Sequence, residues 1–331
     1  MVLIFTNKED AHPNLVIDYL YEWGVPFFRL NTEELLAEYS FCWSADYNGC
    51  DFEIINRENG SMIRGSEITS LWDRRPEPPS ILPIRNSEII NNHIREEALE
   101  FLRYLRYYLD NIPSIGSIVY DRVASSKMLQ YKVALDCGLS MPATVFSNRK
   151  NAFELLGGLY QDLCIKGIGG HGVWDARNMA DYVFYTSKLD SREMAAIPEE
   201  AFTQTVSFLQ EYVPKAFELR VTVVDEDVFA ARIDTQDLDE DKGKVDWRQG
   251  YDSGLRLSEF ILPETIKDKC LALVHALGLN FGCIDLIVRP DGEYVFLECN
   301  PNGQWLWVEL QTGMKISESI ARFLSTNRPI V

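Results

Sequence analysis

The stretch from Phe281 to Pro301, FGCIDLIVRPDGEYVFLECNP, limits the possible folds of this chain more than any other. Two apolar runs flank the sequence Arg289-Pro290-Asp291-Gly292, and Asp-Gly between two such runs is a strong signal for a tight turn that joins two strands. The stretch therefore predicts an antiparallel hairpin that turns near Asp291 and Gly292.

Three oxygen-bearing side chains fall on this hairpin. Asp285 lies in the first run, and Glu298 and Asn300 lie two residues apart in the second, so all three can point to one face. Acidic residues near hairpin ends are often simply solvated, but these carboxylates sit inside apolar runs, where burial of an unpaired charge is costly. Two carboxylates and an amide oxygen suit Mg²⁺, which keeps waters and also binds substrate phosphates. The hairpin thus predicts a nucleotide-type magnesium site.

Length and composition indicate a globular protein of several domains. With 331 residues, of which 46% are hydrophobic, the chain is long enough for two or three domains. No run approaches the roughly 18 consecutive apolar residues of a membrane helix. The N-terminus enters a strand-like run without a basic segment, so we expect no membrane association and a cytoplasmic location. The seven cysteines lack a CxxC pair and favour neither disulfides nor a zinc site.

The net charge of −18 argues against a nucleic-acid partner, which would need a basic face. A phosphorylated or acidic ligand would need local Lys and Arg residues to overcome the field of the whole protein. The acidic run from Asp234 to Asp246 carries much of the imbalance and is typical of a mobile, solvated loop.

Residues 1–113 have the alternating pattern of an α/β layer with a parallel sheet. Asn111-Ile112-Pro113 ends this part and marks a domain boundary, so we expect an N-terminal α/β domain. Its predicted elements are strands at 2–6, 26–30, 52–55 and 70–72 and helices at 13–23 and 87–109.

Two further parts follow, at 114–195 and 196–331. In the first we expect a helix at 125–137 and strands at 143–146 and 163–166. In the second we expect a helix that Pro198 starts and that ends near Gln210, then three β runs, a helix at 263–277 and a closing helix at 316–324. Trp305 and Trp307 alternate, so one is expected to pack inward while the other faces outward.

A glycine-rich loop follows the strand that ends at Lys166. Four glycines occur between Gly167 and Gly172, and such a loop lets backbone N–H groups approach phosphate oxygens. The loop matches neither GxGxxG nor a Walker A sequence, and alone it could equally be a flexible hairpin loop. Lys166 strengthens the phosphate interpretation, because an ammonium at the end of an apolar strand needs an anion. Lys127, in the first turn of a helix, is a second candidate, although it could be an ordinary exposed lysine.

Several arginines are candidates for holding an acidic group. Arg220 lies two residues after Glu218 and therefore on the same strand face, from which it can reach phosphates or an acyl group. Arg232 is the second candidate, with an equal case for a cross-strand ion pair. Arg74 and Arg75 precede a proline-rich break and either face the cleft or pair with nearby acids.

Taken together, these residues resemble the ATP-grasp superfamily of carboxylate–amine and carboxylate–hydroxyl ligases, over about residues 115–310. The most specific element is the order Asp285, Glu298, Asn300-Pro301. The resemblance implies an ATP-grasp fold of the α/β (α+β) class behind the N-terminal domain, with ATP and two Mg²⁺ ions as cofactors. The predicted catalytic residues are Lys166, at the transferring phosphate, and Arg220 and Arg232, which we expect to hold the acidic side chain beside the γ-phosphate. The implied ATP contacts are Lys127, Lys166, Gly169, Gly170 and Gly172 at the phosphates, Glu211, Tyr212 and Val213 at the adenine, and Glu218 at the ribose.

A finer resemblance covers nearly the whole chain. The segments ECNPNGQWLWVE (298–309), LWDRRP (71–76), KAFELRV (215–221) and KVDWR (244–248) are similar to the graspetide ligases, which macrocyclise microviridin-type peptides. In that family the enzyme phosphorylates an Asp or Glu side chain of a ribosomal precursor peptide. A Thr, Ser or Lys side chain of the same peptide then displaces the phosphate and closes an ω-ester or ω-amide ring. The resemblance implies a precursor-peptide partner with a leader and an acidic, Thr-rich core, and a homodimer.

Physical chemistry supports the first of these steps independently. A carboxylate is a poor electrophile, and transfer of a phosphoryl group gives it a good leaving group while Mg²⁺, Lys and Arg neutralise the transferring oxygens. Two alternatives stay open: an ATP-grasp ligase that joins small molecules or adds amino acids to a protein, and a peptide-binding regulatory module with a relic nucleotide site. The intact set of two lysines, a glycine loop and three metal-type side chains argues against the relic.

Overall fold

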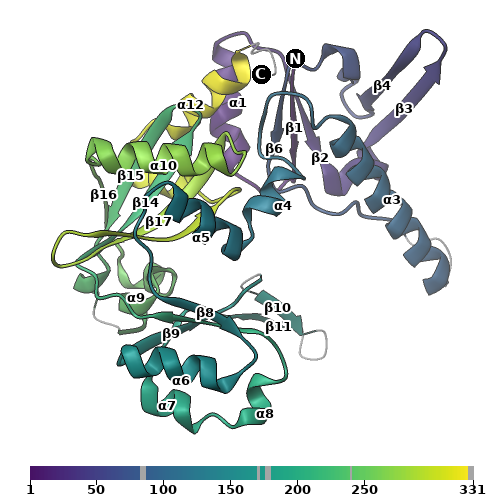
Figure 1. Cartoon of the computed structure of the whole chain (residues 1–331). Coiled ribbons are helices and arrows are strands. Elements are labelled where there is room, and N and C mark those ends of the chain that lie inside the picture. Colours follow the sequence, from purple (N-terminus) through teal and green to yellow (C-terminus); the bar gives the residue numbers. More distant parts are fainter. Residues whose placement is uncertain (83–86, 170–171, 176–179, 239–240, 327–331) are drawn as a thin grey trace.

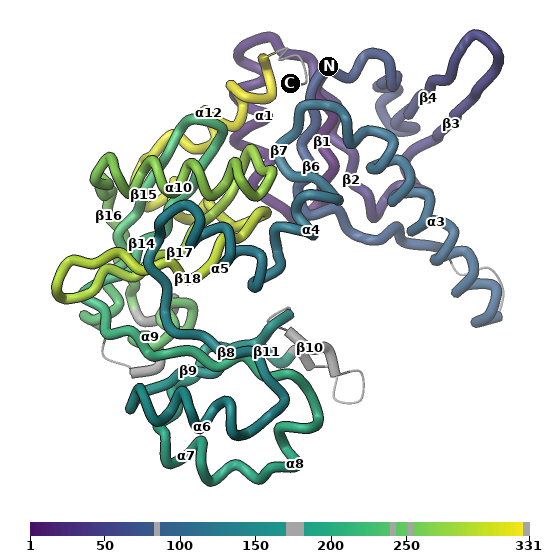
Figure 2. Tube along the Cα trace, in the orientation of Figure 1, coloured from purple at the N-terminus to yellow at the C-terminus, as the bar shows by residue number. Residues whose placement is uncertain are grey.

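The computed structural model describes the chain except for residues 83–86, 170–171, 176–179, 239–240 and 327–331. Its elements form three groups, each built around one main sheet (Figure 1). Figure 2 shows the same arrangement as a Cα trace, with the first group beside the third and the central group below. In the described part of the chain, every helix is too short or too polar to cross a membrane.

The first group has a parallel sheet with helices and extends to residue 115, two residues past the boundary suggested at 113. Its elements are β1 (Val2–Thr6), α1 (His12–Glu22), β2 (Phe27–Asn31), α2 (Leu35–Glu38), β3 (Tyr39–Asp46), β4 (Gly49–Asn56), β5 (Met62–Arg64), β6 (Ser70–Asp73), α3 (Glu88–Tyr108) and β7 (Ser114–Ile115). The main sheet has the order β2-β1-β6-β7 with every pair parallel, and β3, β4 and β5 form a small antiparallel sheet. β1 is buried along its whole length, as expected for a central parallel strand covered on both faces.

The central group is a four-stranded antiparallel sheet with short helices. Its elements are α4 (Tyr120–Ala124), α5 (Lys127–Asp136), β8 (Thr144–Ser147), α6 (Lys150–Leu159), β9 (Asp162–Lys166), β10 (Gly172–Asp175), β11 (Ala180–Val183), β12 (Ser187–Asp190), α7 (Ser191–Ala196), α8 (Glu199–Phe202) and β13 (Ser207–Glu211). The sheet order is β12-β9-β13-β8, and β10 and β11 form a separate hairpin. Of these elements, α4 and α5 lie away from this sheet (Figure 1), and both contribute to the core of the third group.

The helix expected from Pro198 to Gln210 is wrong. α8 ends at Phe202, and β13 pairs with both β8 and β9. A short apolar run such as SFLQE is ambiguous between helix and strand, and here pairing on both sides decides the outcome. Because β13 completes the central sheet, this group extends past residue 195, where the sequence suggested a boundary.

The third group is a five-stranded antiparallel sheet with helices on both faces. Its elements are β14 (Phe217–Val224), β15 (Asp227–Ile233), α9 (Asp241–Val245), β16 (Leu257–Glu259), α10 (Glu264–Ala276), β17 (Phe281–Val288), β18 (Tyr294–Asn300), α11 (Leu306–Thr312) and α12 (Ile316–Ser325). The order is β16-β15-β14-β17-β18, and α5 and α10 bury one face in a core that includes Leu219, Val221 and Leu286. The opposite face of this sheet packs at one end against α12 and the first group. The remainder of that face carries polar side chains.

Two loop expectations differ from the structure. Trp305 and Trp307 lie at the start of α11 rather than on an alternating strand, although Trp305 is indeed buried while Trp307 is only half-buried. The acidic run is not simply solvated, because it contains α9 and ends at Asp246, which is 4% exposed. Charge composition alone could not reveal that Asp246 has a cationic partner.

Candidate nucleotide and metal site

Three metal-type side chains converge on β17 and β18. Asp285 pairs in register with Glu298, and Asn300 lies two residues farther along the same face. Asn300 Nδ2 lies 3.3 Å from both Asp285 Oδ2 and Glu298 Oε1, so the amide must turn over to present its oxygen to a cation. Among the described residues, no three His, Cys, Asp or Glu side chains form a metal cluster by themselves. These three oxygens would therefore suit a cation that completes its shell with phosphates and water.

A β-bulge shapes this edge of the sheet. The register between β17 and β18 shifts between Asp285 and Leu286, which leaves Leu297 as an extra residue on β18. Leu297 and Glu298 consequently line the same cavity, although neighbours on a regular strand point to opposite faces. The strand has no Gly or Pro to signal a bulge, so strict alternation could not identify Leu297 as a site residue.

Lys127, in the first turn of α5, forms an ion pair with Glu298. Ser126 caps this helix by accepting a hydrogen bond from a backbone N–H of its first turn, which fixes the position of Lys127. Burial opposes ionisation of Glu298, but nearby cations, Lys127 foremost, hold the pKa of its carboxyl well below its usual range. Glu298 is therefore an ionised carboxylate, the form that binds a cation.

Arg220 on β14 is the partner of Asp285. Its Nη1 donates to both carboxylate oxygens at 2.9 and 3.0 Å, and its Nη2 donates to the Gln304 carbonyl at 3.1 Å. Burial raises the pKa of Asp285, and Arg220 opposes this rise. Burial alone would lower the pKa of Arg220, but Asp285 raises it above its ordinary value, so the guanidinium stays charged. A bound cation would share the Asp285 carboxylate with this arginine.

A cavity between the central and third groups contains most of the predicted nucleotide contacts. The central group contributes Lys166 and the segment Glu211–Val213, α5 contributes Lys127, and the third group contributes Glu218 and the two carboxylates. Val213, Ile287 and Leu297 pack together and give the cavity an apolar wall. An apolar wall with a few converging polar groups is the usual form of a small-molecule site.

The glycine loop begins at this cavity. Lys166 ends β9 with its Nζ 5.9 Å from the centroid of the Phe208 ring, and Gly167 lines the cavity beside it. Gly169 is exposed with open space where a Cβ would lie, and Gly172 starts β10, which pairs with β11. Gly170 lies outside the described residues. The loop therefore leads from the cavity directly into a two-stranded hairpin.

Glu218 is buried in the cavity wall. Lys215 Nζ donates to Glu218 Oε1 at 2.6 Å and to the Val245 carbonyl at 3.1 Å. Burial raises the pKa of Glu218, and Lys215 opposes the rise. No sequence pattern indicated the role of Lys215, which neutralises Glu218 and ties the start of β14 to the end of α9, in the segment KVDWR (244–248).

That segment, KVDWR, also enters the cavity. Asp246 accepts hydrogen bonds from the Thr186 N–H at 3.0 Å and from Arg248 Nη2 at 2.6 Å. Although burial opposes ionisation, Arg248 lowers the pKa of Asp246. Trp247 stacks on Trp307 with ring centroids 5.0 Å apart. The only sequence signal for these residues was the similarity of this segment to graspetide ligases.

Arg232 is not brought to this site, contrary to the prediction. It pairs across the sheet with Leu219, whereas Arg220 pairs with Ala231, so the two arginines point to opposite faces. Its guanidinium packs over the Phe217 ring, and its Nε donates to a carboxylate on the same chain segment. The alternative of an ion-paired structural arginine fits its position better.

A second cavity, of about 500 Å³, shares Asp285 and Glu298 with the first. In the part of the chain that the structure describes, four arginines line it. In a protein with a net charge of −18, this cluster of positive charge creates a local site for anionic groups. The four arginines are Arg75, Arg122, Arg220 and Arg248.

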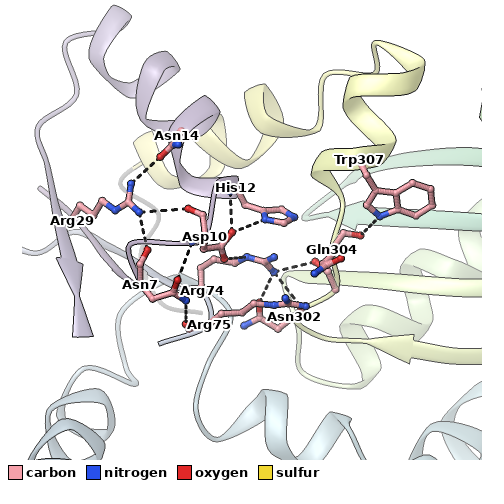
Figure 3. A network of polar contacts seen from close by, with 11 residues as sticks. Asn7, Asp10, His12, Asn14, Arg29, Arg74, Arg75, Asn302, Gln304 and Trp307 are labelled. Carbon is pink, nitrogen blue, oxygen red and sulfur yellow. Dashed lines mark hydrogen bonds and ion pairs between the residues drawn. The ribbon is translucent and has the colours of Figure 1, made fainter. Parts of the chain in front are cut away.

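Figure 3 shows how the first group reaches the wall of this second cavity. Arg74 is 1% exposed; its Nε donates to Asp10 at 3.0 Å and its Nη1 to the Asn302 Oδ1 at 2.7 Å and the Gly303 carbonyl at 3.1 Å. His12 Nδ1 lies 2.6 Å from the other oxygen of Asp10. Arg74 thus ties the first group to the loop that follows the metal-type residues.

Arg75 differs from its neighbour. It has a φ of 48°, in the left-handed region that non-glycine residues rarely adopt, and its carbonyl accepts a hydrogen bond from Asn7 Nδ2 at 2.9 Å. Its side chain is exposed and lines the cavity. Of the two possibilities from the sequence, ion pairing holds for Arg74 and a position facing the cleft holds for Arg75.

No protein-family model matches the chain. Among curated proteins, the tetrahydromethanopterin:alpha-L-glutamate ligase of Methanocaldococcus jannaschii is 23% identical over 238 residues, which cover 69% of this chain and 75% of the relative.

Solved structures match over the whole length. The macrocyclase MdnC of Microcystis aeruginosa, bound with the precursor peptide MdnA, has a TM-score of 0.83 at 28% identity and covers 98% of this chain and 99% of its own. A RiPP-associated ATP-grasp ligase of Chryseobacterium gregarium has a TM-score of 0.89 at 24% identity, with 99% and 97% covered. The ATP-grasp ligase PsnB, complexed with a minimal precursor, Mg and ADP, has a TM-score of 0.74 at 18% identity, with 98% and 96% covered.

The fold and the site define this chain as an ATP-dependent ligase with the ATP-grasp fold. Within that class, it is similar over its full length to ligases that were solved with precursor peptides.

Proposed function

We propose that this chain is a peptide macrocyclase. It activates Asp or Glu side chains of a ribosomal precursor peptide as acyl phosphates and closes ω-ester or ω-amide rings with Thr, Ser or Lys side chains. The observation that carries the proposal is the second cavity, which is lined by arginines, shares the metal-type carboxylates and is large enough for a peptide side chain. The precursor peptide in the MdnC structure, and the leader and core peptide in the Chryseobacterium ligase structure, support it.

The first cavity would hold ATP in this proposal. Asp285, Glu298 and Asn300 would bind Mg²⁺, which supplies neutralising charge at the transferring phosphoryl group. The PsnB complex with Mg and ADP supports this assignment. The proposed ATP contacts are Lys127, Lys166, Gly169, Gly170 and Gly172 at the phosphates, Glu211, Tyr212 and Val213 at the adenine, and Glu218 at the ribose.

The second cavity would position the peptide carboxylate. Arg220 and Arg248 line it beside the metal-type residues and would hold the carboxylate in line with the γ-phosphate. Lys166 would neutralise charge on the phosphoryl oxygens as they transfer. The resulting acyl phosphate stays in the cavity until a hydroxyl or amine of the same peptide attacks its carbonyl and releases phosphate.

Domain division, assembly and location are parts of the same proposal. Residues 1–113 would be the N-terminal domain, and the central domain would extend through β13. Exposed aromatic side chains on α3 and β3, among them Tyr104, Tyr107 and Trp43, offer a surface that a second copy would cover in a homodimer. A cytoplasmic location would give the enzyme both ATP and newly made precursor peptides. An acidic, Thr-rich core would match the arginines of the second cavity.

Intact-mass spectrometry tests the proposal. The peptide encoded beside this gene is incubated with the enzyme, ATP and Mg²⁺, and we expect loss of one water per ring, absent without ATP. Glu298→Ala should abolish the loss of water, and Arg232→Met, on the opposite face, is its control. An unchanged peptide, together with ADP release on addition of free amino acids, would move the assignment to a ligase like the Methanocaldococcus relative.

A further inference from the structure

The second cavity contains a carboxylate for which phosphoryl transfer has no use. Asp121 on α4 lines it together with the metal-type side chains. The Ser117 N–H donates to Asp121 Oδ1 at 3.1 Å, and Asn302 Nδ2 lies 3.3 Å from Oδ2. Among the described residues, Asp121 forms no ion pair with a Lys or Arg side chain, because Arg106 pairs with Asp73 and Arg220 pairs with Asp285. Asp121 therefore differs from Asp285 and Glu298, which have cationic partners.

A hydrogen-bond chain from the first group fixes this carboxylate. Arg74 donates to the Asn302 Oδ1, so the Asn302 Nδ2 must point the other way (Figure 3). There it donates to the Asp73 carbonyl at 2.9 Å and toward Asp121. Asn302 cannot rotate without breaking the contact with Arg74, and Asp121 is thereby held at the cavity wall.

The surroundings of Asp121 favour proton exchange near neutral pH. Burial, followed by the charge of Asp73 on β6, raises the pKa of Asp121 to about 7. Arg106 on α3 opposes the rise, but it is paired with Asp73 at 2.6 Å. Other charged groups near Asp121 are Asp110, which accepts a hydrogen bond from Ser117 Oγ, and Arg122 on the same helix. Arg75, Arg220 and Arg248 line the same cavity. A base whose pKa lies near the working pH both accepts and releases a proton efficiently.

We propose that Asp121 is the general base of ring closure, an inference that rests on the proposed macrocyclase function. As a Thr or Ser hydroxyl of the peptide attacks the acyl phosphate, the Asp121 carboxylate accepts the hydroxyl proton. A new carbon–oxygen bond forms, and the bond from the carbonyl carbon to the phosphate oxygen breaks with its electron pair going to phosphate. The proton then passes from Asp121 to the phosphate, which leaves as HPO₄²⁻ and regenerates the carboxylate.

The test separates activation from ring closure in the Asp121→Asn variant. Hydroxylamine is a strong nucleophile that needs no base, so it traps the acyl phosphate of the peptide as a hydroxamate. With the adjacent-gene peptide, ATP and Mg²⁺, we expect ring closure to fall by about 10²–10⁴-fold while hydroxamate formation changes less than about threefold. Ring closure by the native enzyme should also slow as the pH falls below about 7, and this dependence should be absent from the variant.

A matched control variant separates the role of Asp121 from a general effect of replacing an Asp by Asn. Asp225→Asn makes the same chemical change at a residue outside the second cavity and should leave both products unchanged. Asp121→Asn with normal ring closure would overturn the proposal. Loss of hydroxamate as well as ring closure would also overturn it, because Asp121 would then be a structural residue. If the native enzyme gives neither product, the macrocyclase function itself fails.

Discussion

Arg220→Met should lower the free energy of unfolding more than a double variant that removes both charges of the Arg220–Asp285 ion pair. The Arg220 side chain is 5% exposed and that of Asp285 13%, so solvent screens little of their interaction. Arg220→Met keeps most of the side-chain volume but leaves the Asp285 carboxylate buried without its cation. Loss of one partner of a buried pair costs about 3–5 kcal/mol, whereas loss of both charges in Arg220→Met/Asp285→Asn should cost about 2 kcal/mol or less.

Urea unfolding followed by tryptophan fluorescence measures these differences. Mg²⁺ should restore part of the stability of Arg220→Met, because a divalent cation can replace the guanidinium, but it should not stabilise the double variant. Arg232→Met is the matched control, since this arginine is 40% exposed on the opposite face and should change stability by less than about 1 kcal/mol. Equal destabilisation of the single and double variants would refute the reasoning.

Three further predictions follow from the same contacts. In Gly303→Ala, the new Cβ would lie 2.7 Å from Cys283 Sγ and 2.8 Å from Arg220 Nη2, so unfolding free energy should fall by about 1–3 kcal/mol and peptide turnover should drop; unchanged values of both would contradict the packing. Burial opposes ionisation of Asp10, but His12 and Arg74 lower its pKa, so its carboxylate stabilises the fold above its unfolded pKa of about 4 and this stabilisation is lost as the pH falls. Asp10→Asn should accordingly be less stable than the native protein at pH 7 and approach it toward pH 3, and a pH-independent difference in urea unfolding would be the contrary result. Lys166→Met should raise the KM for ATP or abolish turnover, and unchanged nucleotide kinetics would remove Lys166 from the phosphate site.

Elements with strong local signals were predictable. β1 (Val2–Thr6) has the predicted bounds, and α3 (Glu88–Tyr108) differs from its predicted range by one residue at each end. Ser87 accepts a hydrogen bond from the first turn of α3, and Gly292 has the positive φ that the hairpin turn requires. These features depend on neighbours in sequence, which is why pattern and capping residues were sufficient.

Features set by pairing between distant segments were not predictable. β13 becomes a strand only because β8 and β9 flank it, and the bulge at Leu297 carries no sequence mark. Arg232 was placed on the wrong face because the sequence does not show which residue of β15 pairs with Leu219. The sequence of a strand shows which of its side chains alternate between the two faces of the sheet, but it does not show the register in which the strand pairs with its neighbour.

The contacts that form the wall of the second cavity could not be predicted from the sequence either. Arg74 and Asn302 are 228 residues apart, and Asp121 reaches the same place from a third segment. Of these residues, Arg74 stands out in the sequence as one of two arginines before a proline-rich break, in a segment that resembles graspetide ligases, and Asn302 only within another such segment. No spacing rule connects a strand end in one domain with a loop of another, so the sequence supplied the candidate residues but not their contacts.

Oxygen-isotope transfer tests the central claim most directly. The Asp and Glu carboxyl groups of the adjacent-gene peptide are labelled with ¹⁸O, and the phosphate released during the reaction with ATP and Mg²⁺ is analysed by mass spectrometry. Activation as an acyl phosphate predicts one labelled oxygen in phosphate for each ring closed. Ring closure with unlabelled phosphate would contradict it, because the carboxyl oxygen would then never have been bonded to phosphorus.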